Sequence, residues 1–189
     1  MARLRTFIAV ELERAIRDRT LALQAKLANT GVDVKWAEPE NMHLTLLFLG
    51  EVEDREVVAV CRAVQKCCAE WPAFPMRVEK TGCFPNARRP RVVWVGIGDG
   101  AEDLIELHDA LEEPLLELGC YRREDRPYTP HITLGRVKGD GDTEELTAAL
   151  AKEANWQGGE MTVREVRVMS SELKSKGPEY TVLSRVKLS

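Results

Sequence analysis

The stretch Asn41-Met42-His43-Leu44-Thr45-Leu46-Leu47-Phe48-Leu49-Gly50 contains a His-x-Thr-x unit that recurs once, as His131-Ile132-Thr133-Leu134. Two of the three histidines in the chain lie in these two repeats. Alternate side chains of a β-strand point to the same face. We therefore expect the His and Thr of each repeat to share one face, and Leu44, Leu46 and Phe48 to share the opposite face. The pattern predicts two strands that bury an aliphatic side in a core and direct an imidazole and a hydroxyl into a cleft.

Two histidines that face one cleft suit acid–base chemistry at phosphorus. An unperturbed imidazole titrates near pH 6.5, so one ring can be neutral while the other is protonated. In-line displacement uses such a pair, because a base activates the attacking water and an acid protonates the leaving oxygen. The hydroxyls of Thr45 and Thr133 would donate hydrogen bonds to phosphate oxygens. This scheme requires no metal and no cofactor.

Charge that develops on the phosphate calls for a nearby cation. Basic residues outside the two repeats supply the candidates, which are Arg126, Arg136, Arg88, Arg89, Lys80, Lys138 and Lys174. The cluster Arg88-Arg89-Pro90-Arg91 is more often a solvated loop. In a chain with a net charge of −4 it is also a candidate contact for a nucleic-acid backbone. The aromatic residues Trp36, Trp94, Tyr128 and Phe7 are candidates for stacking a terminal base, although core packing is the commoner role.

A single His-x-Thr unit in a strand most often holds a partly buried, hydrogen-bonded imidazole with no catalytic role. Two copies in comparable strands favour a functional interpretation, because Val or Ile would serve β-propensity better than histidine. The third histidine, His108, lies at helical spacing between Leu104 and Leu111. We predict that His108 is an ordinary packing or surface histidine.

Length and composition indicate one soluble globular domain. The chain has 189 residues, of which 44% are apolar and 31% charged. No run approaches the roughly 18 apolar residues that span a membrane, and the first residues read as a strand and not as a signal peptide. Five cysteines without a C-x-x-C unit predict free thiols. We expect a cytoplasmic monomer that binds no membrane.

Hydrophobic periodicity predicts strands that alternate with helices. Besides the two repeats, the expected strands cover 3–10, 32–36, 74–80, 91–97, 161–169 and 180–188. The expected helices cover 11–29, 53–70, 101–118 and 142–154, and Pro114 should kink or split the third of them. Residues 81–90 and 170–178 are expected to be loops. The fold class is α+β, with residues 1–189 as a single domain of two intertwined lobes. This pseudo-duplicated bilobal fold has two mostly antiparallel sheets, outer helices and a central cleft.

The paired repeats resemble the two-histidine phosphoesterase superfamily, and their surroundings resemble its RNA 2′,3′-cyclic phosphodiesterase branch, also called 2′-5′ RNA ligases. The matching stretches follow the expected order along nearly the whole chain. They are Arg5-Thr6-Phe7-Ile8-Ala9-Val10, Asn41 to Gly50, Pro90-Arg91-Val92-Val93-Trp94-Val95-Gly96, Tyr128-Thr129-Pro130-His131-Ile132-Thr133-Leu134-Gly135-Arg136, Ser171-Glu172-Leu173 and Gly177-Pro178-Glu179-Tyr180.

The resemblance implies metal-independent opening of an RNA 2′,3′-cyclic phosphate to a 2′-phosphate. His43 would protonate the leaving 3′ oxygen and His131 would activate water, although the sequence permits the reverse assignment. Thr45 and Thr133 would bind the phosphate, with Arg136 as cationic helper. The partners would be RNA ends or nucleotides that carry the cyclic phosphate, and the reverse reaction would be ATP-independent 2′-5′ ligation. Two alternatives stay open: a non-catalytic RNA-end or nucleotide-binding module, and a phosphodiesterase for small cyclic nucleotides or ADP-ribose cyclic phosphate.

Overall fold

The computed structural model describes residues 3–175 and 177–189 and confirms an α+β fold with a curled, antiparallel sheet. Its helices are α1 (Arg14–Ala28), α2 (Asp54–Cys68), α3 (Ala101–Glu117) and α4 (Glu144–Lys152), with one 3-10 turn, η1 (Pro39–Asn41). Its strands are β1 (Arg3–Glu11), β2 (Val34–Trp36), β3 (His43–Glu53), β4 (Phe74–Phe84), β5 (Val92–Ile97), β6 (His131–Val137), β7 (Gln157–Val163), β8 (Glu165–Lys174) and β9 (Gly177–Lys187). Among these described residues, no helix is long and apolar enough to cross a membrane.

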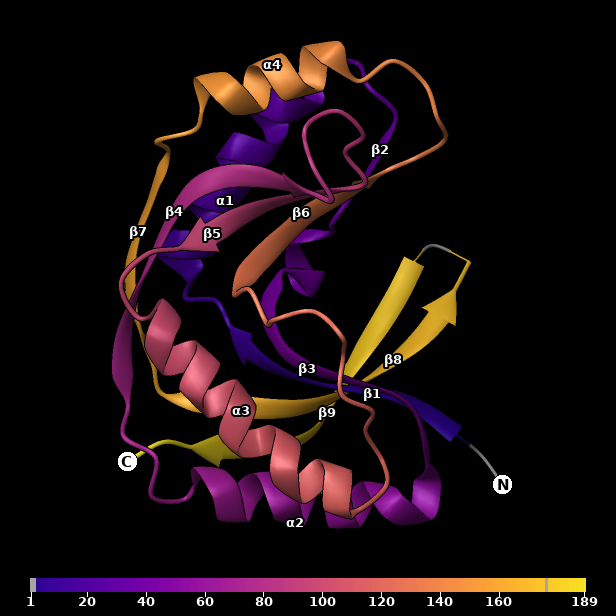
Figure 1. Ribbon diagram of the computed structural model, residues 1–189, viewed down its shortest axis with the longest axis vertical. Coiled ribbons are helices and arrows are strands. Elements are labelled where there is room, and N and C mark those ends of the chain that lie inside the picture. Colours follow the sequence, from indigo (N-terminus) through magenta and orange to yellow (C-terminus); the bar gives the residue numbers. More distant parts are fainter. Residues whose placement is uncertain (1–2, 176) are drawn as a thin grey trace.

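The sheet consists of two halves with their own helices. The strand order is β7-β4-β5-β6-β3-β1-β8-β9, and β2 pairs with β6. Helices α1 and α4 lie together at one end of the molecule, and α2 and α3 lie together at the other end (Figure 1). The chain crosses repeatedly between the halves, since β1 and β3 belong to one half whereas β2 and β4 belong to the other. The organisation as a single domain stays a prediction.

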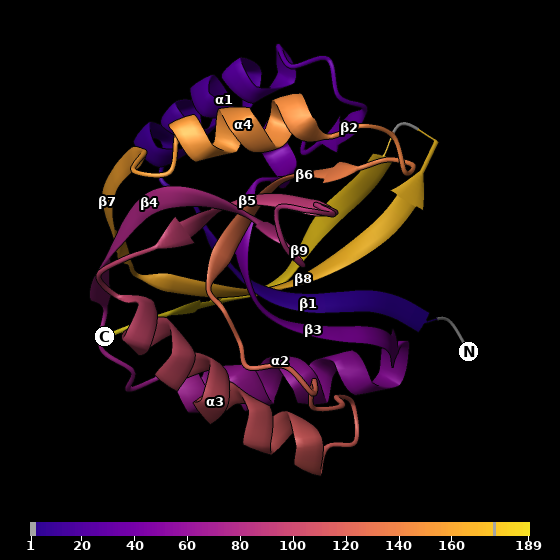
Figure 2. The ribbon, with the colours of Figure 1, turned by 45° about the horizontal axis from the view of Figure 1, so that its top comes forward.

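The two halves meet where β3 pairs with β6. These strands are antiparallel, and the pairing within the described residues joins Leu44 to Ile132. Both of these side chains are fully buried. Because neighbouring side chains alternate between faces, the histidine and threonine on either side of each buried residue point to the opposite face. The two predicted sheets are therefore joined into one sheet by the pairing of Leu44 with Ile132. This pairing places the two repeats side by side, on the neighbouring strands β3 and β6 (Figure 2).

A β-bulge follows the threonine in the first repeat. Thr45 pairs with Ala9 and Leu47 pairs with Ile8, which leaves Leu46 as the extra residue. Leu44 and Leu46 are buried, as predicted. The prediction for Phe48 is wrong, because the bulge reverses the alternation beyond it. Phe48 pairs with Phe7 in the sheet, is 44% exposed and has its ring centroid 5.7 Å from that of Phe7.

The second repeat carries a bulge at the equivalent position. Thr133 pairs with Trp94 and Gly135 pairs with Val93, so Leu134 is the extra residue. The Leu134 carbonyl accepts hydrogen bonds from the backbone N–H of Ala37 (2.8 Å) and from the Gln24 amide (3.0 Å). A Cβ atom on Gly135 would lie 2.7 Å from Val34, so the close approach of β2 to β6 requires glycine there. The bulge moves Arg136 into the place that Phe48 occupies in the first repeat.

Several predicted boundaries are wrong. The prediction that α3 splits at Pro114 is wrong: the helix continues through Pro114, which lies in its last turn and removes one backbone hydrogen bond from it. Residues 161–169 form the end of β7 and the start of β8, which are separated at Arg164. Residues 81–84 extend β4. Residues 170–174 and 177–178 are paired in the β8–β9 hairpin, Ser175 lies in its turn, and residue 176 lies outside the described residues.

We predict that the contact between the halves contributes strongly to stability. Leu44→Ala should lower the free energy of unfolding by about 2–5 kcal/mol, because it removes buried methyl groups at the joint between the halves. Leu173→Ala is the matched control, since Leu173 is 72% exposed and should change stability by less than about 0.5 kcal/mol. Urea denaturation measures both values. Equal stabilities of the two variants would contradict a structural role for this joint.

Candidate active site

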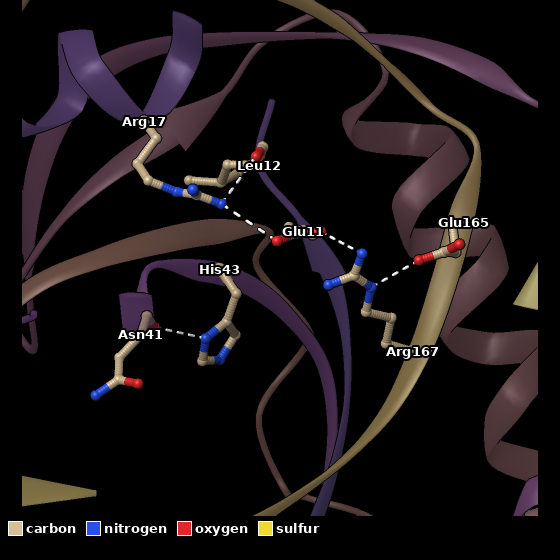
Figure 3. A network of polar contacts seen from close by, with 7 residues as sticks. All are labelled: Glu11, Leu12, Arg17, Asn41, His43, Glu165 and Arg167. Carbon is tan, nitrogen blue, oxygen red and sulfur yellow. Dashed lines mark hydrogen bonds and ion pairs between the residues drawn. The ribbon is translucent and has the colours of Figure 1, made fainter. Parts of the chain in front are cut away.

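The orientation of His43 is fixed from both sides of its ring. Turn η1 leads directly into β3, and His43 Nδ1 lies 2.7 Å from the carbonyl oxygen of Asn41 (Figure 3). A carbonyl oxygen only accepts hydrogen bonds, so Nδ1 carries the proton. Nε2 is 2.9 Å from the Thr45 hydroxyl and accepts its hydrogen bond. Nε2 of the neutral ring therefore lies on the face that His43 shares with Thr45, as the strand pattern predicts.

His131 repeats this arrangement in the second half of the sheet. Its Nδ1 atom lies 2.7 Å from the carbonyl oxygen of Thr129, so Nδ1 again carries the proton. In both repeats the accepting carbonyl belongs to the residue two positions before the histidine. The antiparallel pairing of Leu44 with Ile132 sets Thr133 beside His43 and Thr45 beside His131 on one face. The structure thus brings together the four residues that the sequence singles out.

Aromatic rings surround both imidazoles. Phe7 stacks on His43 with centroids 5.0 Å apart and an interplanar angle of 27°, and Tyr180 contacts the same imidazole edge-on at 5.4 Å. Phe84 contacts His131 edge-on at 5.0 Å. These rings exclude water from one side of each imidazole and restrict its rotation.

The predicted stacking residues have different positions in the structure. Phe7 and Trp94 lie at the site, with the Trp94 ring centroid 6.3 Å from that of His131. Trp36 lies on β2, where its indole is close to Gly135. The sequence pattern did not single out Phe84 or Tyr180. Phe84 falls in the segment expected to be a loop, and Tyr180 belongs to a stretch that carries the resemblance but was given no role. Their proximity to the histidines depends on the curl of the sheet.

Burial lowers the pKa of both histidines. For His43, loss of solvent lowers the pKa and the hydrogen bond to the Asn41 carbonyl acts in the opposite direction. For His131, loss of solvent again lowers the pKa, the Thr129 carbonyl opposes this, and the charge of Arg136 lowers it further. Both imidazoles are therefore mainly neutral at pH 7 in the free protein. Each ring is therefore protonated to a smaller extent than an unperturbed imidazole would be.

Arg136 is the candidate cation whose charge acts on this site. Besides its effect on His131, Arg136 and Arg5 both lower the pKa of Tyr180, against the larger opposing effect of burial. Arg5 was not predicted, although it lies on β1, the strand that pairs with β3. Positive charge from both halves of the sheet thus reaches the surroundings of His43.

The other predicted cations lie in different surroundings. Lys80 pairs with Glu79, Lys138 with Asp33 and Lys174 with Glu172, whereas Arg88 and Arg126 are exposed. Arg89 and Arg91 both form ion pairs with Asp140, which neutralises part of the charge of the basic loop at 88–91.

An ion-pair network supports the strand opposite His43. Glu11, the β1 partner of His43, accepts a hydrogen bond from Arg17 of α1 (3.3 Å) and forms an ion pair with Arg167 of β8 (Figure 3). Arg167 Nε in turn donates to Glu165 at 2.6 Å. The network ties α1, β1 and β8 together beside the first residue of β3, so it holds the backbone on which His43 is mounted.

The β8–β9 hairpin is fastened to the same region. The Asn41 side-chain amide donates to the Pro178 carbonyl at 2.9 Å, two residues before Tyr180. Asn41 therefore orients His43 through its carbonyl and positions the Tyr180 segment through its side chain. In the part of the chain that the structure describes, no group of three or more His, Cys, Asp or Glu side chains is arranged to hold a metal ion.

Comparison with known proteins identifies relatives of this chain. The family model of the 2′-5′ RNA ligase superfamily matches residues 9–174. A relative from Methanothermobacter thermautotrophicus, named RNA 2′,3′-cyclic phosphodiesterase, is 35% identical over 95% of this chain and 96% of its own length. A protein of the same name from Archaeoglobus fulgidus is 36% identical over 94% of this chain and 96% of its own length.

Solved structures show the same fold. The protein TT0787 of Thermus thermophilus superposes with a TM-score of 0.83 at 31% identity and covers 98% of both chains. LigT of E. coli in its apo form has a TM-score of 0.80 at 26% identity, with 100% of this chain and 99% of that chain covered. The family model, the full-length relatives and the shared fold together show that this chain belongs to the 2′-5′ RNA ligase superfamily.

Proposed function

We propose that this chain is an RNA 2′,3′-cyclic phosphodiesterase that opens the cyclic phosphate at an RNA end to a 2′-phosphate. The names of its relatives support the cyclic phosphodiesterase activity. The observation that carries the mechanism is the antiparallel pairing of Leu44 with Ile132, which sets both His/Thr pairs on one face. A phosphate on that face would meet an imidazole from each half of the sheet.

The two imidazoles act on opposite sides of the phosphorus. His131 Nε2 takes a proton from water as the water oxygen forms its bond to phosphorus. The bond between phosphorus and the 3′ oxygen breaks, and His43 Nε2 delivers a proton to that oxygen. The Nδ1–H of His43 stays bonded to the Asn41 carbonyl and stabilises the imidazolium before transfer. Exchange with solvent restores both rings, so the cycle needs no co-reactant besides water.

Two features of the site support this division of roles. The charge of Arg136 lowers the pKa of His131 and so favours the neutral form that a base requires. The stacked ring of Phe7, 5.0 Å from His43, favours a cationic imidazole through its π-face. Since burial lowers the pKa of both rings, the negative phosphate must raise the pKa of His43 when it binds.

The threonines and Arg136 bind the phosphate group in this proposal. The hydroxyls of Thr45 and Thr133 donate to non-bridging oxygens, and Arg136 compensates the charge that develops in the transition state. Complexes of E. coli LigT with 3′-AMP and with phosphate support the binding of nucleotides and phosphate by this fold. The reverse reaction joins a cyclic phosphate end to a 5′-hydroxyl end as a 2′-5′ linkage without ATP, because the same groups serve both directions.

The first test measures hydrolysis of an oligoribonucleotide that ends in a 2′,3′-cyclic phosphate, in the presence of EDTA. We expect a 2′-phosphate product, and we expect His43→Ala and His131→Ala each to lower kcat by about 10²- to 10⁴-fold. His108→Ala is the histidine comparison, since His108 belongs to neither repeat, and its kcat should fall by a much smaller factor than that of either repeat variant. The absence of a 2′-phosphate product, or full activity in both repeat variants, would refute the proposal.

The second test assigns the acid and the base. A cyclic substrate with sulfur in place of the bridging 3′ oxygen has a leaving group that needs no proton, because a thiol has a far lower pKa than an alcohol. The defect of His43→Ala should be much smaller on this substrate, whereas the defect of His131→Ala should be the same on both substrates. If the sulfur substrate reduced the defect of His131→Ala and not that of His43→Ala, the acid and base roles would be exchanged.

The third test follows the pH dependence. One imidazole must be protonated and the other neutral, and the pKa values of both are lowered in the free protein. The alkaline limb of kcat/KM, which reports the free enzyme, should therefore have its midpoint below pH 6.5. The alkaline limb of kcat should lie at higher pH, because bound phosphate raises the pKa of the acid. A kcat/KM that is still rising above pH 7 would contradict this account.

A further inference from the structure

Tyr128 occupies a position between the two repeats that the proposed chemistry does not explain. It lies in the segment that connects α3 to β6, three residues before His131. Its hydroxyl donates a hydrogen bond of 2.8 Å to the carbonyl oxygen of Thr45 in the first repeat. Burial raises the pKa of this phenol well above its usual range, so the hydroxyl keeps its proton and remains a donor at every working pH.

The ring of Tyr128 is held from the other side by α3. The imidazole of His108 stacks on it with centroids 4.2 Å apart and an interplanar angle of 3°. His108 is 8% exposed, and its Nδ1 atom is 2.9 Å from the Asp109 carboxylate. Helix α3 is therefore a fixed support for the ring, and the direction of the hydroxyl follows from the position of that helix.

The bond to Thr45 connects the two histidines by a short path. The hydroxyl of Thr45 donates to His43 Nε2, and its carbonyl accepts from Tyr128. The carbonyl of Thr129, the next residue after Tyr128, accepts a hydrogen bond from His131 Nδ1–H. The Tyr128 side chain thus links Thr45, which contacts the His43 imidazole, to the backbone at Thr129, which orients the His131 imidazole. Within the described residues, the two repeats are also joined through the sheet by the pairing of Leu44 with Ile132.

We propose that Tyr128 is a positioning residue that sets the separation of the His43 and His131 imidazoles by bonding the first repeat to the segment that carries the second. The proposal rests on the proposed function, because the separation has a catalytic meaning only if both rings act on one phosphate. Each half would still bind its part of the substrate without this bond. Removal of the bond would therefore slow the chemical step, in which both rings must reach the same phosphorus.

The test compares Tyr128→Phe with Tyr121→Phe. Both variants delete a hydroxyl that donates a hydrogen bond, since Tyr121 donates to Glu112 at 2.9 Å, but Tyr121 is not bonded to either repeat. Tyr128→Phe should lower kcat by about 10- to 100-fold with KM nearly unchanged, because small displacements of reacting groups are costly. Tyr121→Phe should leave kcat near the wild-type value. His108→Ala removes the stacking partner and keeps the hydroxyl, so it should lower kcat in the same direction by a smaller factor.

Crystal structures of the wild type and of Tyr128→Phe give a readout that does not depend on activity. We expect a different separation of the two Nε2 atoms in the variant. An unchanged separation, an unchanged kcat, or an equal loss of kcat in Tyr121→Phe would overturn the proposal. If the wild-type protein does not hydrolyse a cyclic phosphate, the proposed function fails, and the measured separation still decides whether Tyr128 positions the two rings.

Discussion

The antiparallel pair of Leu44 and Ile132 lies at the centre of the molecule, and the arrangement of the site depends on it. Their buried side chains join the cores of the two halves, and their pairing sets the register of the two His-x-Thr units. A register shift of one residue would turn a histidine and threonine toward the core and an aliphatic pair toward solvent. The same contact that stabilises the sheet thus defines which four polar side chains share a face.

Symmetry between the halves continues beyond this pair. Each histidine donates Nδ1–H to the carbonyl two residues before it, and each repeat has a bulge directly after its threonine. Each bulge reverses the alternation of side chains beyond it. The residue two positions after the bulge is of a different type in the two halves. The first half presents the exposed ring of Phe48 there, and the second presents Arg136, whose charge reaches His131. The two halves are alike in how they hold an imidazole and different in what surrounds it.

The sequence predicted the parts of the site that a local pattern determines. His43, Thr45, His131 and Thr133 follow from a repeated motif and from strand alternation, and the structure places them together. The prediction failed for Phe48, because a bulge depends on the pairing of two strands and not on one strand alone.

Residues that reach the site through the curl of the sheet could not be predicted from the sequence pattern. Arg5, Phe84 and Tyr180 come from strands that are far apart in the sequence. Arg5 and Tyr180 belong to stretches that carry the family resemblance, but nothing in their local pattern places their side chains beside the histidines. The lowered pKa values of the histidines likewise depend on burial, which composition does not reveal. Pro114 shows the reverse case, in which a strong local signal has little effect because it falls in the last turn of α3.

The proposed chemistry requires imidazoles from both halves to act on one phosphate, and a crystal structure with bound 2′-AMP tests this requirement. We expect the phosphate of this product analogue to lie within hydrogen-bonding distance of Nε2 of both His43 and His131, with Arg136 beside it. A phosphate that contacts one imidazole alone, or that binds away from the face shared by the two repeats, would contradict the account.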